Sequence, residues 1–347
     1  MRFGPVPVEE AVGALAAHSV RAGEAVVKKG RRITAEDAAR LAAAGVASVV
    51  AVRLDPDDIG EDEAARLLAE VLAGGDVAVE RPFTGRSNLF ATNAGVLVVD
   101  KAAIDRLNEV DEAITAATLP LHKPVVEGEM VGTVKIIPYA VPRRVLEEAV
   151  VAARVASDGG VRVAPYRLKN VAVVSTLLPG LKPGVVAKTI DVLGQRLSPA
   201  GAAVSSETRT LHDPAALTRE LEALARTDAE LVVVFGASAI ADRQDVIPRA
   251  IEGAGGRVEH FGMPVDPGNL LLLGELSGKP VIGAPGCARS PKENGFDWIL
   301  HRLLAGLPVT RADITGLGVG GLLMEIVSRP QPRAGGSSGE GVEEEEG

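Results

Sequence analysis

The segment VVVFGASAIADRQDVIPRAIEGAGG, residues 232–256, begins with branched apolar residues, turns on small residues and places three charged side chains in a bend. These are Asp242, Arg243 and Asp245. Carboxylates in such a bend can accept hydrogen bonds from ligand nitrogens or orient a metal-bound water, and a guanidinium can pair with a phosphate. The Gly-Ala-Ser run at 236–238 allows the backbone to approach a ligand closely. This bend is therefore a candidate ligand-binding loop.

The same bend also fits ordinary local structure. Asp245 stands where an N-cap is expected for the following helix, since Pro248 is tolerated in a first helical turn. Asp242 precedes that cap, at a position where a carboxylate is common in a solvated turn. The spacing alone leaves both interpretations open for each aspartate.

Three more loops combine glycine, proline and polar residues after a predicted strand. They are STLLPGLKPG (175–184), MPVDPGN (263–269) and GAPGCARSPKEN (283–294). In an open parallel sheet, ligands bind beyond the carboxyl ends of the strands, and helix N-termini there attract anions. We therefore expect all four loops to meet at one edge of the sheet.

The last of these loops holds further candidates. Ser290 and Glu293 have the spacing of a helix capping box. Arg289 and Lys292 flank the expected helix start, where the helix dipole disfavours cations unless an anion lies between them, and this favours a bound phosphate. Cys287, the only cysteine, is either a nucleophile or a small buried side chain.

The elements that position these loops follow from residue 169 onward, where short β-branched runs alternate with helical patterns. This alternation is typical of a parallel sheet with crossover helices. Asp213 followed by Pro214 predicts a helix start. We predict an α/β fold over residues 169–328, a three-layer open and mostly parallel sheet of about five strands. The predicted strands are 171–175, 231–235, 257–261 and two joined at Ser277-Gly278.

A smaller α+β region is expected over residues 1–168. Thr34 and Gly45 bound one predicted helix there, another ends near Gly74, and residues 120–142 alternate β-formers with Pro and Gly. After the body, residues 329–347 combine Pro, Gly, Ser and a glutamate run, which predicts a disordered acidic tail.

The bulk composition narrows the function classes. The net charge of −9 and 3% aromatic residues argue against broad binding to nucleic acid or anionic membranes. No apolar run reaches the ~18 residues of a membrane span, and the first residues lack a signal-peptide pattern. With one cysteine and no zinc-ligand spacing, we expect a cytoplasmic protein with no membrane or nucleic-acid partner and no residues dedicated to a metal.

Residues 235–290 resemble the molybdopterin-binding domain of molybdenum-cofactor biosynthesis proteins. A small-residue turn followed by aspartate, a Pro-Gly loop and a second Pro-Gly loop occur here in the family's order and spacing. The matching positions are Gly236, Ala237, Ser238, Asp242, Asp245, Pro267, Gly268, Asn269, Pro285 and Gly286.

The resemblance implies molybdopterin, free or adenylated, as ligand or substrate, with molybdate and Mg²⁺ as further candidate ligands. It gives Asp242 and Asp245 catalytic roles if the protein inserts molybdate into the pterin dithiolene. The implied cofactor-binding residues are Thr176, Gly236, Ala237, Ser238, Pro267, Gly268, Asn269, Pro285 and Gly286.

The similarity extends to residues 30–52 and 127–141, which look like accessory segments of the molybdopterin molybdotransferase branch. The whole chain is similar to the amino-terminal half of bacterial fusion proteins that end in a cytidylyltransferase domain. In the family the first strand runs into a Thr-Gly-Asp-Glu turn, whereas here Thr176 remains and the acids do not. The alternative to a transferase is therefore a non-catalytic carrier or sensor that delivers the cofactor to a cytidylyltransferase or molybdoenzyme. Family members assemble as homo-oligomers, so an oligomer is expected.

Overall fold

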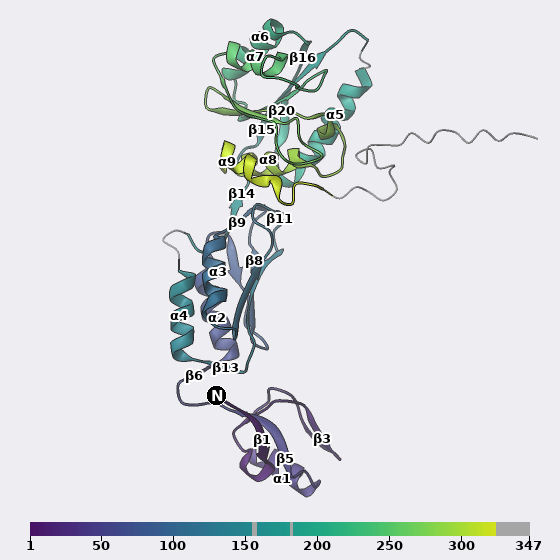
Figure 1. The fold of residues 1–347 in the computed structure, drawn as a ribbon. Helices are drawn as coiled ribbons and strands as arrows, with labels where there is room; N and C mark the ends of the chain where they lie inside the picture. Colours follow the sequence, from purple (N-terminus) through teal and green to yellow (C-terminus); the bar gives the residue numbers. More distant parts are fainter. Residues whose placement is uncertain (155–157, 181–182, 324–347) are drawn as a thin grey trace, which may run out of the picture. The chain divides into compact units, whose positions relative to one another are not determined.

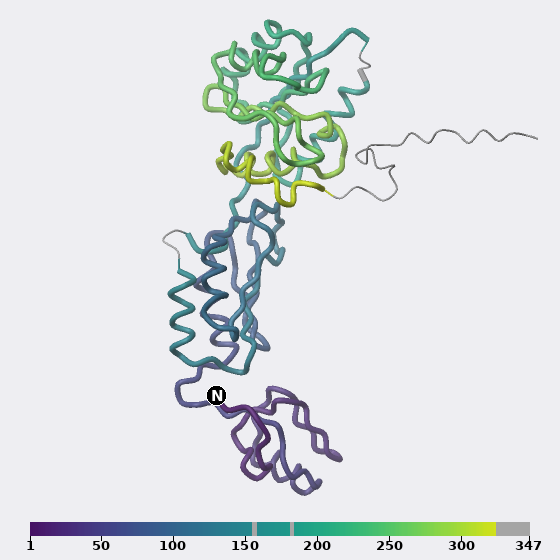
Figure 2. The backbone as a smooth tube through the Cα atoms, viewed as in Figure 1, coloured from purple at the N-terminus to yellow at the C-terminus, as the bar shows by residue number. Residues whose placement is uncertain are grey.

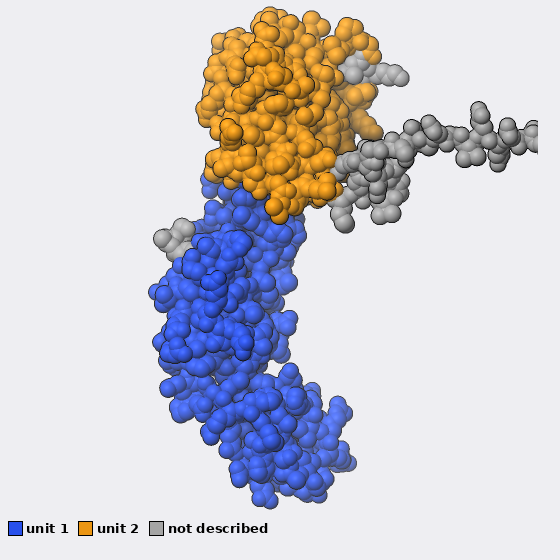
Figure 3. Space-filling model, in the orientation of Figure 1, with its two compact units in different colours: residues 1–169, 197–202, 301–307 blue, residues 170–196, 203–300, 308–347 orange. Residues whose placement is uncertain are grey.

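The structure is a computed structural model that describes residues 1–154, 158–180 and 183–323 (Figures 1 and 2). The predicted tail at 329–347 lies outside these residues. The chain forms two compact units, coloured separately in Figure 3. Unit 1 comprises residues 1–169, 197–202 and 301–307, and unit 2 comprises residues 170–196, 203–300 and 308 onward. Two short segments from the second half of the sequence thus belong to unit 1.

The first part of unit 1 is a small mixed α/β assembly. A three-stranded sheet has the order β1-β5-β2, next to the β3-β4 hairpin. Thr34 caps α1 as predicted, because its Oγ1 accepts from the Asp37 amide at 3.1 Å while the Asp37 carboxylate accepts from the Thr34 amide at 3.0 Å. The elements are β1 (Arg2–Pro7), η1 (Val8–Glu10), β2 (Leu15–Ala16), β3 (Val20–Ala22), β4 (Ala25–Val27), α1 (Ala35–Ala43) and β5 (Ser48–Arg53).

Strand β1 is an edge strand whose outer side carries two prolines. The Val8 amide donates to the Ala47 carbonyl at 3.1 Å, on the side of β5. Backbone hydrogen-bonding groups alternate sides along a strand. The backbone groups of Phe3, Pro5 and Pro7 therefore face away from β5. Two of these three positions have no N–H to donate.

The second part of unit 1 has three helices and three sheets. The sheets have the orders β10-β12-β8-β7, β11-β9-β14 and β13-β6. Buried residues of α2 and α4 form one core with the strands, including Leu68, Leu72, Leu89 and Ile136. The elements are β6 (Asp58–Gly60), α2 (Glu61–Leu72), β7 (Val77–Val79), β8 (Arg86–Ala91), β9 (Gly95–Val99), α3 (Lys101–Val110), β10 (Ile114–Thr118), β11 (Pro124–Val125), β12 (Met130–Ile136), β13 (Ala140–Pro142), α4 (Arg143–Ala153) and β14 (Val161–Pro165).

Unit 2 is built on a six-stranded sheet with the order β16-β15-β17-β20-β19-β18. The pairs β15–β16, β15–β17 and β17–β20 are parallel, whereas β19 is antiparallel to both its neighbours. The strands are β15 (Asn170–Leu177), β16 (Ala203–Leu211), β17 (Leu231–Phe235), β18 (Arg257–Phe261), β19 (Leu272–Leu276) and β20 (Lys279–Ala284).

The helices of unit 2 begin largely where the sequence places them. Asp213 and Asp245 cap α6 and α7 through their side chains. Both helices pack on one face of the sheet, where Leu217, Leu221 and Ile251 meet strand residues. The helices of the second half of the chain, of which η2 and the end of α8 fall in unit 1, are α5 (Pro183–Leu197), η2 (Ser198–Ala200), α6 (Pro214–Ala225), α7 (Val246–Gly253), η3 (Gly286–Arg289), α8 (Gly295–Leu304), α9 (Arg311–Thr315) and η4 (Gly316–Gly318).

One strand was missing from the sequence prediction. Strand β16, AVSSETRTL, raises the count from about five to six. Its residues alternate between exposed and half-buried, and none is fully buried. An edge strand of this kind has no apolar run to reveal it, because neither of its faces lies in the core.

Candidate functional site

The carboxyl ends of the sheet strands lie at one edge of unit 2. Leu177 pairs with Leu211 at the ends of β15 and β16, and Phe235 pairs with Ala284 at the ends of β17 and β20. Phe235 also pairs with Ser175, two residues before the end of β15. The end of β18 reaches the same edge because Phe261 pairs with Leu272 and Leu272 pairs with Gly283. The loops that begin at 236, 262 and 285, and the short link at 212–213, therefore start at a common edge.

The turn after β17 is tied to two other loops. Its Ala237 amide donates to Thr176 Oγ1 at 2.8 Å, and its Gly236 carbonyl accepts from Arg289 Nη2 at 2.8 Å. A Cβ at Gly236 would lie 2.6 Å from the Ser238 carbonyl oxygen, so the turn requires glycine there. Thr176 is buried whereas Ser238 is exposed. The structure thus brings together Thr176, Gly236, Ala237 and Ser238, four of the residues implied by the resemblance.

His212 joins this group, and the sequence interpretation missed it. Its Nδ1 is 2.8 Å from Thr176 Oγ1 and its Nε2 is 2.9 Å from Ser238 Oγ. The imidazole is half-buried. His212 follows β16, the strand that escaped prediction, and directly precedes the Asp213 cap. A histidine beside a cap at a strand end is the signal that could have identified it.

Asp242 and Asp245, in the bend between β17 and α7, have different surroundings. Asp245 accepts from the Val246 amide at 2.7 Å with Oδ1 and from the Ala241 amide at 3.1 Å with Oδ2, so both carboxylate oxygens serve the local backbone. The exposed Asp242 carboxylate accepts from the Gln244 amide at 2.7 Å. In the described part of the chain, the hydrogen bonds of these two carboxylates all lie within residues 241–246.

The Pro267-Gly268-Asn269 segment contacts the start of α8. The peptide bond before Pro267 is cis, and Gly268 has a φ of +141°. A Cβ at Gly268 would lie 3.0 Å from the Gly295 Cα, and the Gly295 amide donates to the Pro267 carbonyl at 2.9 Å. Asn269 is exposed, and its carbonyl accepts from the Met263 amide at 2.9 Å. The segment is thereby fixed next to the loop that follows β20.

The loop after β20 corrects the predicted capping box. Helix α8 begins at Gly295 rather than near Ser290, and Glu293 accepts from the Trp298 indole at 3.0 Å instead of capping. Asn294 Oδ1 accepts from the Phe296 amide at 3.1 Å, and Asp297 Oδ2 accepts from the Asn294 amide at 2.8 Å. The predicted start was wrong because the buried Arg196 binds the carbonyls of 288, 290 and 292, which holds these residues outside helix α8.

Within that loop, Pro285 precedes the short η3 helix and Gly286 begins it. Cys287 is half-buried, and its Sγ lies 3.5 Å from Asn294 Oδ1. Burial raises the pKa of the Cys287 thiol. A raised pKa keeps the thiol protonated, which favours the structural interpretation of this cysteine over the nucleophilic one.

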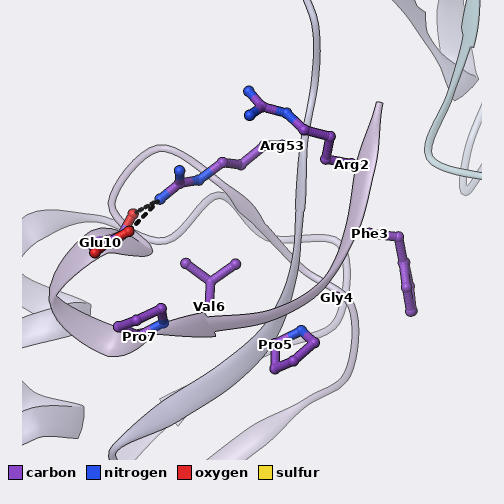
Figure 4. Close-up of a pocket in the computed structure, with 8 residues that line it drawn as sticks. All are labelled: Arg2, Phe3, Gly4, Pro5, Val6, Pro7, Glu10 and Arg53. Atoms are coloured by element: carbon purple, nitrogen blue, oxygen red, sulfur yellow. Dashed lines mark hydrogen bonds and ion pairs between the residues drawn. The ribbon is translucent and has the colours of Figure 1, made fainter.

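A surface hollow of about 260 Å³ lies elsewhere, along β1 in unit 1 (Figure 4). Arg53 and Glu10 form an ion pair at 3.8 Å on one side, and Phe3 is 59% exposed. The lining residues are Arg2, Phe3, Gly4, Pro5, Val6, Pro7, Glu10 and Arg53. None of the residues predicted from the sequence to bind a ligand lines it.

Within residues 1–154, 158–180 and 183–323, no group of three or more His, Cys, Asp or Glu side chains could hold a metal ion. Over the same part of the chain, no helix has both the length and the apolar character needed to cross a membrane.

Comparison with known proteins gives a family match in the N-terminal segment. The model of a domain of unknown function (DUF8806) matches residues 5–53. No curated protein matches the chain.

Two solved structures are similar at low identity. The molybdopterin biosynthesis MoeA protein from Pyrococcus horikosii is 16% identical, with 88% of this chain and 75% of that chain covered and a TM-score of 0.31. A molybdenum cofactor biosynthesis protein from Pyrococcus furiosus is 12% identical, with 91% and 65% covered and a TM-score of 0.26. At these TM-scores neither likeness defines the fold or the function of this chain.

Proposed function

We propose that unit 2 binds molybdopterin at the carboxyl edge of its sheet and acts in molybdenum-cofactor biosynthesis. The observation that carries this proposal is the common edge from which the turn at 236–238, the Pro267-Gly268 loop and the Pro285-Gly286 loop all begin. These are the three segments whose order and spacing resemble the molybdopterin-binding family. Loops at the carboxyl edge of such a sheet are the usual location of a ligand site.

Two parts of the ligand, its phosphate and its pterin ring, have a chemical counterpart at this edge. The terminal phosphate suits the Arg289 guanidinium, which binds the small-residue turn. The donors of the pterin ring suit the exposed Asp242 carboxylate. We further propose that α5 and α8 cover the sheet face opposite α6 and α7, which completes a three-layer arrangement around the site.

The residues at this edge favour a protein that binds molybdopterin without inserting the metal. The segment after β15 lacks the acids of the family's Thr-Gly-Asp-Glu turn. Both carboxylate oxygens of Asp245 accept hydrogen bonds from backbone amides, one from Val246 in α7 and one from Ala241 in the preceding bend. This carboxylate is therefore a poor candidate for holding a metal-bound water. The proposed role is therefore a carrier that holds the cofactor for a partner enzyme. Molybdate insertion is the second candidate, with the exposed Asp242 as its carboxylate.

The experiment that tests binding uses the full chain and a fluorescent pterin. Purified protein is denatured, and the released material is examined for the oxidised pterin, before and after incubation with molybdopterin. Stoichiometric retention is expected. Asp242→Ala is expected to lose about tenfold in affinity, since a charge-assisted hydrogen bond contributes ~1.5 kcal/mol. Asp228→Ala, which removes an exposed carboxylate before β17, is the matched control. A protein that retains no pterin contradicts the proposal.

The carrier and transferase candidates are separated by one incubation. The protein is mixed with adenylated molybdopterin and molybdate, and metal-loaded cofactor is measured over time. A carrier gives bound, unmetallated cofactor at one equivalent. Multiple turnovers of metal-loaded product would instead identify a molybdotransferase.

A further inference from the structure

A chain of hydrogen bonds connects the buried end of β15 with the exposed turn after β17. The Ala237 amide donates to Thr176 Oγ1 at 2.8 Å. Thr176 Oγ1 lies 2.8 Å from His212 Nδ1, and His212 Nε2 lies 2.9 Å from Ser238 Oγ. Three separate strand ends thus contribute to one polar network that reaches the surface at Ser238.

The donor and acceptor roles in this chain of hydrogen bonds follow from which group carries each proton. Thr176 Oγ1 already accepts from Ala237, and its proton has two acceptors, His212 Nδ1 at 2.8 Å and the Phe235 carbonyl at 3.5 Å. We assign the threonine proton to the shorter contact, with Nδ1 as its acceptor, because the opposite tautomer would leave that proton only the 3.5 Å contact to the Phe235 carbonyl. The neutral imidazole then carries its proton on Nε2 and donates to Ser238 Oγ.

The consequence is a free donor at the end of the chain. Ser238 Oγ accepts from His212, so its own hydroxyl proton can be directed to a ligand. Hydrogen bonds aligned in one direction polarise each other and strengthen the last donor. An acceptor with negative charge gains most from such a donor.

Arg289, at the end of η3, places a positive charge beside the same turn. Arg289 donates to the Gly236 carbonyl at 2.8 Å, and its guanidinium carbon lies 5.6 Å from the centre of the Phe235 ring. Burial lowers the pKa of Arg289 below its ordinary value, although the group stays charged. No carboxylate in the described part of the chain forms an ion pair with Arg289, whose hydrogen bond goes to the Gly236 carbonyl. A half-buried cation without a counter-charge favours an anion beside it.

We propose that Ser238 and Arg289 form a subsite for a tetrahedral oxyanion, and that His212 is the positioning residue that aligns the Ser238 donor. Two sources share this chemistry: the phosphate monoester of a bound pterin and a free oxyanion such as molybdate. The assignment to the pterin phosphate rests on the proposed function, whereas the subsite itself does not.

A nucleophilic serine would need the opposite direction of the chain. Ser238 would donate to Nε2, and Nδ1–H would require an acceptor that stabilises the imidazolium, a role that a buried carboxylate fills in serine hydrolases. Thr176 stands there instead, and its neutral hydroxyl cannot offset the charge of an imidazolium as a carboxylate does. The geometry therefore favours a donor to an anion over an attacking hydroxyl.

The test measures oxyanion binding to the full chain by isothermal titration, with inorganic phosphate and molybdate as separate probes. Ser238→Ala is expected to weaken binding of the preferred oxyanion about tenfold, and Ser238→Thr, which keeps the hydroxyl, to restore most of it. Arg289→Gln is expected to lose at least as much. Ser205→Ala, an exposed hydroxyl on β16, is the control and should bind as the parent chain does.

The two histidine variants separate positioning from folding. His212→Asn keeps a polar group near Nδ1 for Thr176 but does not reach Ser238, so it should bind as weakly as Ser238→Ala. His212→Gln reaches toward Ser238 and should recover part of the affinity. The double variant of His212→Asn with Ser238→Ala should lose no more than either single variant, because the two residues act in series. Circular dichroism confirms that each variant is folded.

Three outcomes overturn the inference. The parent chain could fail to bind both oxyanions, or folded Ser238→Ala could bind them as the parent does. A fluorophosphonate could label Ser238 in a His212-dependent way, which would make the serine a nucleophile. Failure of the proposed function looks different, because oxyanion binding would then depend on Ser238 although no pterin is retained.

Discussion

Arg196 and Asp297, 101 positions apart in the sequence, form a buried ion pair in unit 2. The same guanidinium donates to the carbonyls of Ala288 at 2.8 Å and Ser290 at 2.6 Å. One side chain of α5 therefore fixes the whole path of the loop that follows β20. Its charge is compensated by Asp297 and its donors by carbonyls, which is the condition under which a buried arginine is tolerated.

Removing Arg196 should destabilise unit 2 strongly. Arg196→Met leaves Asp297 as a buried, uncompensated charge, and the expected loss is about 3–5 kcal/mol in the free energy of unfolding. Urea denaturation followed by circular dichroism measures it. Arg219→Met, which removes an exposed arginine from α6, should change stability by less than about 0.5 kcal/mol. Equal stability of the two variants would show that the buried pair does not hold the loop.

Gly236→Ala tests the turn that carries the proposed site. The added Cβ would approach the Ser238 carbonyl to 2.6 Å, so the turn must shift at an expected cost of about 1–3 kcal/mol. Gly194→Ala is the matched change, because a Cβ added there within α5 would meet no atom within 4 Å beyond the neighbouring helix backbone, and alanine favours a helix by ~1 kcal/mol. Gly236→Ala should lower the urea midpoint of unfolding, and Gly194→Ala should raise it. A neutral Gly236→Ala would mean that the turn is free to rearrange.

Asp245→Ala distinguishes the cap from a ligand group. The loss of the N-cap of α7 should cost ~1 kcal/mol in stability while pterin affinity stays within twofold of the parent value. Urea denaturation and pterin fluorescence titration measure the two quantities on the same preparation. A tenfold loss of affinity at unchanged stability would assign the carboxylate to the ligand instead.

Ionisation of the Tyr166 hydroxyl should destabilise the folded protein at alkaline pH. Burial raises the pKa of its hydroxyl to about 12, and the hydroxyl lies 2.8 Å from His301 Nδ1. The ordinary tyrosine pKa is about 10, so the unfolded chain ionises first. The stabilising contribution is complete below pH ~10 and is lost as the pH rises toward 12, by an amount on the order of 2 kcal/mol.

Urea denaturation at pH 9 and pH 11 measures this loss for the parent chain and for Tyr166→Phe. The variant cannot ionise at this position, so its stability should fall less between the two pH values. An identical fall in both proteins would place the alkaline effect at another group.

The sequence was sufficient for the parts of the fold that local chemistry determines. Thr34, Asp213 and Asp245 cap helices where their spacing predicts, and the small-residue loops begin at one edge because the strands before them run parallel, as the alternation of strands and helices predicts. The α/β class of the second half and the α+β character of the first follow from the same patterns.

The remaining features depend on distant contacts. Strand β16 is polar on an exposed edge, so no periodicity marks it, and His212 at its end was missed with it. The start of α8 was placed too early because the residue that displaces it, Arg196, comes from another helix. Spacing within one loop carries no information about such a partner.

The two prolines on the outer side of β1 limit how residues 1–53 can join other molecules. A free strand edge normally recruits a further strand through its N–H groups, and here Pro5 and Pro7 remove two of the three. The small sheet is therefore closed to growth by backbone pairing on that side. Any association there must be made by side chains, which choose their partners by shape and charge and do not template aggregation.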